Sequence, residues 1–266
     1  MLIAEIWALF RRTRVRALLA VLFAIPVLLA VAVKLSGGPS AGNGPTFLDR
    51  VSHNGVFAAL AGLTVTITFF LPLTVSVVAG DTIAGEASLG TLRYLLTRPA
   101  GRVRLLAVKG VATACFCLAA ALTVAVGGLL AGFVLFPVGD LVSLSGTTLS
   151  LGSGILRTFA AAGIVGVSLM GLAAIGMFVS TLTDVPVGAM AATVGLAVLS
   201  AILDSVSQVH AIHPWLLTHY WLSFGDVLRS PVGWHNVVAN LREQGGYVLV
   251  FGLATWARFT SRDVLA

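Results

Sequence analysis

The residues best suited to chemistry in this chain are three histidines that lie close together, His210, His213 and His219. Imidazole nitrogens are common zinc ligands, and the three could hold an ion together with a carboxylate or a thiolate. No such partner stands in the same run of residues. Asp204 falls at the end of an apolar segment, where contact with solvent explains an acid. We therefore predict no metal site.

Sequence motifs for ATP binding and for common membrane-embedded enzymes are absent. The only two lysines, Lys34 and Lys109, do not follow a glycine as the phosphate-binding pattern G-x-x-x-x-G-K requires. No histidine begins H-E-x-x-H, and no serine lies within G-x-S-x-G. We expect no catalytic residue and no cofactor in this chain. The energy for active transport would then come from another chain or from an ion gradient.

The composition is that of a chain that crosses a membrane several times. Hydrophobic residues make up 58% of the 266 residues and charged residues only 10%, whereas a soluble domain carries about 25% charged residues. The net charge of +6 sits largely in a few loops, which suits membrane topology and anionic lipid. No basic stripe interleaved with aromatic residues is present, so we expect a lipid bilayer and no nucleic acid as partner.

The apolar segments predict an all-α polytopic membrane protein, folded as a single domain over residues 1–266. Six transmembrane helices are expected, at 17–35, 56–79, 103–136, 156–181, 186–203 and about 244–257. Residues 1–16 combine an apolar face with four arginines, which indicates a helix lying in the cytoplasmic interface. Gly128 and Gly132 form a small-xxx-small pair suited to close helix contact. The distribution of lysine and arginine favours a multi-pass protein of the cell inner (cytoplasmic) membrane with both termini cytoplasmic.

One long charged run, residues 81–109, separates two strongly apolar segments. The run contains two acids, Asp81 and Glu86, and five basic residues, Arg93, Arg98, Arg102, Arg104 and Lys109. Such a density of basic residues beside a span marks a cytoplasmic loop. Leucines at helical spacing between Ala84 and Leu96 predict a short amphipathic helix, which Pro99-Ala100-Gly101 would end. Glu86 would then lie near a helix N-terminus, where its charge favours the helix dipole by ~0.3–1 kcal/mol.

This run resembles the loop after the second span of ABC-2 type ABC-transporter permeases, the membrane subunits of type V exporters. In that family the pattern E-x-x-x-G-T-L-x-x-L-L-T-x-P-x-x-R forms the coupling helix that touches the ATPase subunit. A generic basic loop explains the arginines here but not the glutamate, the Gly-Thr pair or the proline. The resemblance places the coupling helix in residues 81–102 and implies that these residues couple to an ATPase: Glu86, Gly90, Thr91, Leu92, Arg93, Leu96, Arg98, Pro99 and Arg102.

The resemblance implies the membrane subunit of an ATP-driven exporter. A separate ATP-binding-cassette subunit would hold ATP and Mg, and a second permease copy or a homologous permease would complete the pathway. The centres of the expected spans carry no Asp, Glu, Lys or Arg, which favours an apolar or amphipathic substrate over proton or sodium coupling. A drug, a peptide, a lipid and a glycan all remain open as substrates. The alternatives are an ion-gradient secondary transporter and a membrane-embedded enzyme.

Residues 204–243 are too long for a plain turn and too apolar for a solvated loop. We expect them to form an outer re-entrant segment before the sixth span, with short helices at about Leu216–Leu228 and Trp234–Arg242. Irregular backbone at membrane depth requires cover by protein or by a water-filled cavity. We therefore predict that aromatic residues of the segment form an outer gate, and the alternative is an interfacial belt facing lipid. The predicted gate residues are Trp215, Tyr220, Trp221 and Phe224.

Overall fold

The computed structural model describes residues 1–36, 48–88, 90, 101–142 and 145–261. Almost all of these residues are helical, apart from a two-stranded antiparallel hairpin of β1 (Leu141–Val142) and β2 (Thr148–Leu149). The helices, with 3-10 helices marked η, are α1 (Leu2–Arg11), α2 (Thr13–Ser36), α3 (Leu48–Val51), α4 (Val56–Thr68), α5 (Phe70–Ser88), α7 (Arg102–Leu135), α8 (Leu151–Ser168), α9 (Met170–Leu182), α10 (Pro186–Ser205), η1 (Ser207–Trp215), η2 (Trp221–Leu228) and α11 (Trp234–Ser261).

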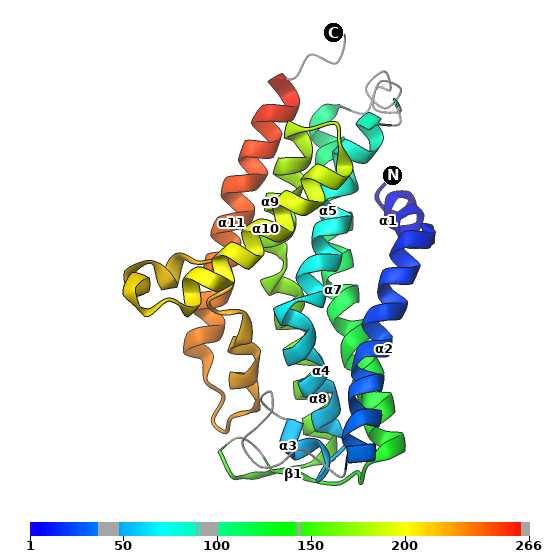
Figure 1. The fold of residues 1–266 in the computed structure, drawn as a ribbon, viewed down its shortest axis with the longest axis vertical. Coiled ribbons are helices and arrows are strands. Elements are labelled where there is room, and N and C mark those ends of the chain that lie inside the picture. Colours follow the sequence, from blue (N-terminus) through cyan, green and yellow to red (C-terminus); the bar gives the residue numbers. More distant parts are fainter. Residues whose placement is uncertain (37–47, 89, 91–100, 143–144, 262–266) are drawn as a thin grey trace.

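The long helices lie alongside one another in an elongated bundle (Figure 1). One end holds α1 and the last turns of α11, and we call it the basic end because it carries Arg11, Arg12 and Lys109. The β1–β2 hairpin and α3 lie at the opposite end, the hairpin end. α7 runs between the two ends and packs against α2, α4 and α8. α10 instead ends near mid-height, where η1 protrudes from the side of the bundle before η2 continues toward the hairpin end.

The outer surface of the bundle is apolar, as expected of helices that face lipid. Val134, Leu156 and Leu249 are 82%, 71% and 63% exposed. α2, α7, the α8–α9 pair and α10 are each long and apolar enough to cross a membrane, and the bent α4–α5 pair adds a fifth if it is one span. These features confirm the prediction of an all-α polytopic membrane protein. The count of six spans stays a prediction, since α11, with Arg242 and Glu243 in its interior, is not among these helices.

The second expected span contains a sharp bend of 55° between α4 and α5, at Phe69. Pro72 explains the bend, because proline has no N–H to donate to the carbonyl of Thr68 and its ring clashes with that carbonyl. Beyond the bend, α5 continues to Ser88, well past the expected end of the span at residue 79. The second helix pair therefore reaches into the charged run.

The N-terminal residues form two helices rather than one interfacial helix over residues 1–16. Arg12 separates α1 from α2, because its backbone is extended with φ −60° and ψ 129°. α1 presents Ile3 and Trp7 outward, 83% and 62% exposed. On its inner side Phe10 contacts Phe116 of α7, with ring centroids 6.3 Å apart. An apolar outward surface on a helix at the basic end suits an interfacial position, which stays a prediction.

The segment after α10 differs from the expected pair of short α-helices. The first, expected at Leu216–Leu228, is replaced by a turn over residues 216–220 followed by the 3-10 helix η2. Another 3-10 helix, η1, precedes that turn. The second expected helix, Trp234–Arg242, is wrong as a separate element, because it forms the first turns of the 28-residue helix α11. No proline interrupts the chain after Gly233, so nothing stops this helix before Ser261.

Glycine allows the close crossing of α7 with α4 near the hairpin end. A Cβ atom added to Gly132 would overlap the backbone carbonyl of Gly55, and one added to Gly128 would overlap the backbone of Ala59. The predicted small-xxx-small pair is therefore confirmed as a helix contact. Backbones at this separation gain dispersion contacts that larger side chains would prevent, and such contacts hold helices together where lipid removes the hydrophobic driving force.

We predict that Gly132→Ala destabilises the fold. The new methyl group forces α4 and α7 apart, at a cost of about 1–3 kcal/mol from overpacking. Gly163→Ala in α8 is the matched control, because a Cβ atom there meets nothing within 4 Å. Alanine in a helix interior is more favourable than glycine by about 0.5–1 kcal/mol. In detergent, the thermal unfolding temperature should fall for Gly132→Ala and hold or rise for Gly163→Ala. Equal unfolding temperatures for the two variants would contradict the close crossing.

Candidate functional site

The basic end holds a charged junction formed by Glu5, Arg12, Asp81, Glu86 and Lys109. Lys109 lies near the start of α7, and its side chain is only 4% exposed. Its ammonium group lies 2.5 Å from a carboxylate oxygen of Glu86 on α5 and 3.1 Å from one of Glu5 on α1. An ammonium group is costly to bury unless it is paired, so Lys109 requires both α1 and α5 to be in place.

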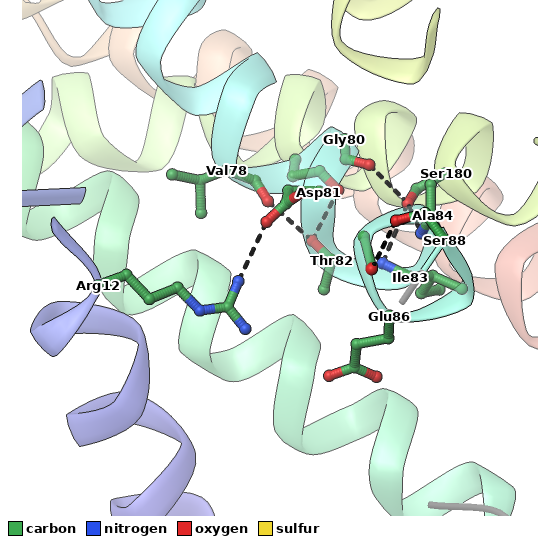
Figure 2. Close-up of polar contacts among 12 residues, drawn as sticks. Arg12, Val78, Gly80, Asp81, Thr82, Ile83, Ala84, Glu86, Ser88 and Ser180 are labelled. Carbon is green, nitrogen blue, oxygen red and sulfur yellow. Dashed lines mark hydrogen bonds and ion pairs between the residues drawn. The ribbon is translucent and has the colours of Figure 1, made fainter. Parts of the chain in front are cut away.

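Glu86 lies in the last turn of α5, and its side chain extends away from that helix (Figure 2). The expected position near a helix N-terminus is wrong, because no new helix starts at Ala84. The dipole at a helix C-terminus disfavours a carboxylate, and the Lys109 ammonium offsets this repulsion. Gly90 follows with φ +68°, and its N–H donates to the carbonyl of Ala87 at 3.0 Å. A glycine in this left-handed conformation is a common way to end a helix.

A second ion pair joins the corner between α1 and α2 to α5. Nη1 of Arg12 lies 3.1 Å from a carboxylate oxygen of Asp81, as Figure 2 shows. The arginine side chain is 45% exposed, so this pair contributes only about 0–1 kcal/mol. Its effect is to orient the corner rather than to stabilise it strongly.

Ser180 of α9 bonds to the backbone of α5 beside the junction (Figure 2). Its Oγ accepts hydrogen bonds from the N–H groups of Ile83 at 3.0 Å and Ala84 at 2.8 Å, and it donates to the carbonyl of Gly80 at 2.7 Å. A side chain inserted into the ladder of a helix in this way satisfies backbone groups that a distorted turn leaves open. α9 is thereby tied to the same turns of α5 that carry Asp81 and Glu86.

The structure places only part of the predicted coupling set. Glu86 and Gly90 lie at the end of α5, and Arg102 is the first residue of α7. Outside the described residues lie Thr91, Leu92, Arg93, Leu96, Arg98 and Pro99. A coupling role for this set stays a prediction. Sequence reasoning missed Glu5 and Ser180 as members of this region.

An apolar contact closes the basic end beside the charges. Phe259 of α11 is 4% exposed and packs against Ile83 of α5 and Leu105 of α7. The last turns of α11 are therefore fixed against the two helices that flank the charged run.

The four predicted gate residues do not share one environment. Trp221 and Phe224 of η2 are 4% and 1% exposed and belong to the hydrophobic core. Trp215 at the end of η1 is 78% exposed. The ring of Tyr220 meets that of His219 edge-on, with centroids 4.6 Å apart. Trp221 and Phe224 thus contribute packing, and a gating role for the four residues stays a prediction.

The turn between η1 and η2 is held by hydrogen bonds from two helices. The hydroxyl groups of Ser200 on α10 and Thr218 lie 2.9 Å apart, and the N–H of Thr218 donates to the same serine at 3.2 Å. From α11, the buried amide of Gln244 donates to the carbonyl of Leu217 at 3.0 Å. These polar residues inside apolar helices were not singled out in the sequence, although buried amides and hydroxyls in membrane helices commonly bond to a neighbour.

A cavity of about 500 Å³ opens beside this turn. The bend between α4 and α5 forms one wall, and α10 and η2 form the others. Most of its lining is apolar, with Asp204 and Thr218 among the polar residues. The lining includes Ile67, Phe69, Pro72, Val198, Trp221 and Leu222.

Comparison with known proteins identifies the family. Residues 4–238 match the family described as ABC-2 family transporter protein. The chain belongs to the ABC-2 family. A stretch of 111 residues is also 39% identical to the probable ABC transporter permease protein NosY of Pseudomonas aeruginosa. That stretch covers 39% of this chain and 37% of the relative, so the chain spans little more than a third of the length of the relative it matches.

Membership of the ABC-2 family confirms the resemblance read from the charged run. It makes the chain a multi-pass membrane transport protein. It also favours an ABC transporter over the two alternatives, a membrane-embedded enzyme and an ion-gradient transporter. The charged junction of this ABC-2 protein lies where the resembled coupling loop leaves α5 and enters α7.

We predict that Lys109→Met destabilises the ABC-2 chain by roughly 3–5 kcal/mol, because it leaves the Glu86 carboxylate in a largely buried place without the ammonium group. The double variant Lys109→Met/Glu86→Gln should recover much of this loss, since the glutamine carries no charge. Arg12→Met is the control, and loss of its exposed pair should cost less than about 1 kcal/mol. Thermal unfolding in detergent compares the four proteins. A double variant no more stable than Lys109→Met would contradict the pairing.

Proposed function

We propose that this chain is the permease subunit of an ATP-driven ABC exporter, with its basic end facing the cytoplasm. A separate ATP-binding-cassette subunit binds there and holds ATP and Mg. A second permease copy, or a homologous permease, completes the pathway in the cytoplasmic membrane. The observation that carries the proposal is the match between the charged run and the family pattern of the coupling helix, on a chain of the ABC-2 family.

The arrangement of the basic end supports the contact with an ATPase. The charged run spans the end of α5 and the start of α7. Within it, Lys109 of α7 pairs with carboxylates of α5 and α1, and so joins the three helices. A push on the run is therefore delivered to three helices at once, since buried ion pairs resist separation. Ser180 extends the same connection to α9. In this proposal α1 is the second contact with the ATPase.

The cavity beside η2 supports an apolar or amphipathic substrate. Its wall of aliphatic and aromatic side chains suits burial of an apolar group, while Asp204 and Thr218 offer polar contacts at its edge. The bend at Phe69 forms part of this wall, and the same helix pair continues through α5 to Glu86. Motion of the charged run is thus connected through one bent helix pair to the cavity, which supports outward movement driven from the basic end.

We predict that Gly90→Ala weakens coupling to the ATPase. Alanine in the left-handed conformation costs about 1–2 kcal/mol, so the turn that follows α5 changes shape. The measurement is the ATPase activity of a partner subunit that co-purifies with the permease, reconstituted with wild-type or variant permease. We expect stimulation by the permease to fall several-fold for Gly90→Ala, with insertion into the membrane unchanged.

Gly146→Ala is the matched control. Gly146 also has a positive φ, +82°, and a Cβ atom at either glycine meets nothing within 4 Å. The local strain is therefore similar, but Gly146 lies near the β1–β2 hairpin, at the end away from the proposed contact. If both variants stimulate the ATPase like the wild type, the position of the coupling contact is wrong.

A further inference from the structure

Three potential metal ligands converge where α10 ends and the chain turns back along η1. Asp204 lies in the last turn of α10, His213 in η1 and His219 in the turn that follows. One ligand atom from each side chain lies within 4.8 Å of the other two. The expectation that no carboxylate stands beside the histidines is therefore wrong. The turn of the chain brings Asp204 to residues that follow it by 9 and 15 positions.

The hydrogen bonding of His213 leaves a free lone pair in the middle of this group. Its Nε2 lies 3.2 Å from the backbone carbonyl of Val206, and a carbonyl oxygen can only accept a hydrogen bond. Nε2 therefore carries the proton in the neutral ring, and Nδ1 is unprotonated. This Nδ1 faces Oδ1 of Asp204 at 3.9 Å. Two electron-rich atoms in this arrangement favour a cation between them. A backbone carbonyl that fixes the ring in this way is typical of histidines that bind a metal.

His219 places a second imidazole nitrogen on the same carboxylate oxygen. Its Nδ1 lies 2.6 Å from Oδ1 of Asp204 and donates a hydrogen bond to it, so a bound metal ion would take the place of that proton. The rings of His213 and His219 are close to each other, with centroids 5.8 Å apart. The side chains of all three ligands are largely, but not fully, covered, with between 17% and 31% of each exposed. An ion could therefore enter the group and would then have limited contact with solvent.

A second carboxyl group lies in this region. Glu243 of α11 lies near enough to Asp204 for their charges to interact. Neither of its carboxylate oxygens is exposed, and neither has a hydrogen-bond partner among the described residues. A covered carboxyl group beside Asp204 offers a further potential ligand from α11.

We propose that Asp204, His213 and His219 bind a divalent transition-metal ion of the zinc class. Two imidazole nitrogens and one carboxylate oxygen form a donor set that suits zinc and its neighbours, whereas magnesium and calcium prefer oxygen ligands throughout. Zinc binds such atoms at about 2.0–2.2 Å, which places neighbouring ligand atoms roughly 3.3 Å apart. Nδ1 of His213 therefore has to move toward Oδ1 of Asp204 from 3.9 Å, and Nδ1 of His219 has to move away from its 2.6 Å contact with the same oxygen. Water or Glu243 occupies the remaining position. The ion ties the end of α10 to the turn between η1 and η2, on the wall of the cavity that Asp204 lines.

The test uses the full chain in detergent, stripped with a chelator and titrated with Co²⁺ as a spectroscopic probe for zinc. We expect about one Co²⁺ per chain, with the intensified visible absorption of a four-coordinate nitrogen and oxygen site. His213→Ala and His219→Asn should each weaken binding at least tenfold. His219→Asn keeps an amide that can still bond to Asp204, so it removes the imidazole with the least effect on the fold. The fold of each variant is intact if the metal-free protein elutes as a single monodisperse species and has the unfolding temperature of the metal-free wild type.

The matched control is His210→Ala, from the same 3-10 helix. Its ring lies near that of His213, with centroids 6.5 Å apart, but it does not belong to the converging group. We expect it to bind Co²⁺ like the wild type. The proposal is overturned if the wild type takes up no Co²⁺ at micromolar concentrations, or if either ligand variant binds as tightly as the wild type. It is equally overturned if His210→Ala loses as much affinity as His213→Ala. None of these outcomes depends on the ATPase contact, so the proposed transport function is tested separately.

Discussion

The arrangement of the basic end depends on the burial of a single ammonium group, that of Lys109. An unpaired ammonium in an apolar bundle would cost several kcal/mol, and it is tolerated here because carboxylates arrive from two other helices. Glu5 comes from α1 and Glu86 from α5. Glu86 is also in a place that needs the lysine, since it stands at the unfavourable end of the α5 dipole. The three helices therefore meet around one buried charge.

This dependence couples the helices of the basic end to one another. Ser180 adds α9 through the backbone of α5, and Phe259 adds the end of α11 through apolar packing. The charged run begins within the end of α5 and finishes within the start of α7, so both of its ends belong to this assembly. At mid-height, the bend at Phe69 makes the same helix pair a wall of the cavity. One continuous path of packed elements thus connects the end where an ATPase is proposed to bind with the region proposed to receive substrate.

Hydropathy was enough to locate α2, α7, the α8–α9 pair and α10, because each is a local apolar stretch whose backbone bonds to itself. The contact made by the Gly128–Gly132 pair could also be predicted, since two small residues four apart always share a helix face. The position at which α5 ends could not be predicted. The local pattern there suited a new amphipathic helix at Ala84, but Ile83 and Ala84 are buried within α5, where their N–H groups donate to Ser180 of α9. Tertiary contacts of this kind override local propensity.

Contacts between distant residues account for the rest of what the sequence did not show. Glu5 and Lys109 are 104 residues apart, and no local pattern joins them. The histidines were noticed, but their carboxylate was not, because only the turn into η1 brings Asp204 beside them. The aromatic residues of the η1–η2 segment divide into the buried Trp221 and the exposed Trp215. Short 3-10 helices separated by a turn share no continuous period, so periodicity could not assign their faces.

The central claim is that the basic end receives an ATP-binding subunit, and site-specific photo-crosslinking in membranes tests it most directly. A photoreactive residue at Ser88, the exposed last residue of α5, should capture a soluble ATP-binding-cassette protein. The same residue at Gly139, exposed beside the β1–β2 hairpin, should capture none. Capture of the ATPase from Gly139 and not from Ser88 would contradict the account, because it would place the partner at the opposite end of the bundle.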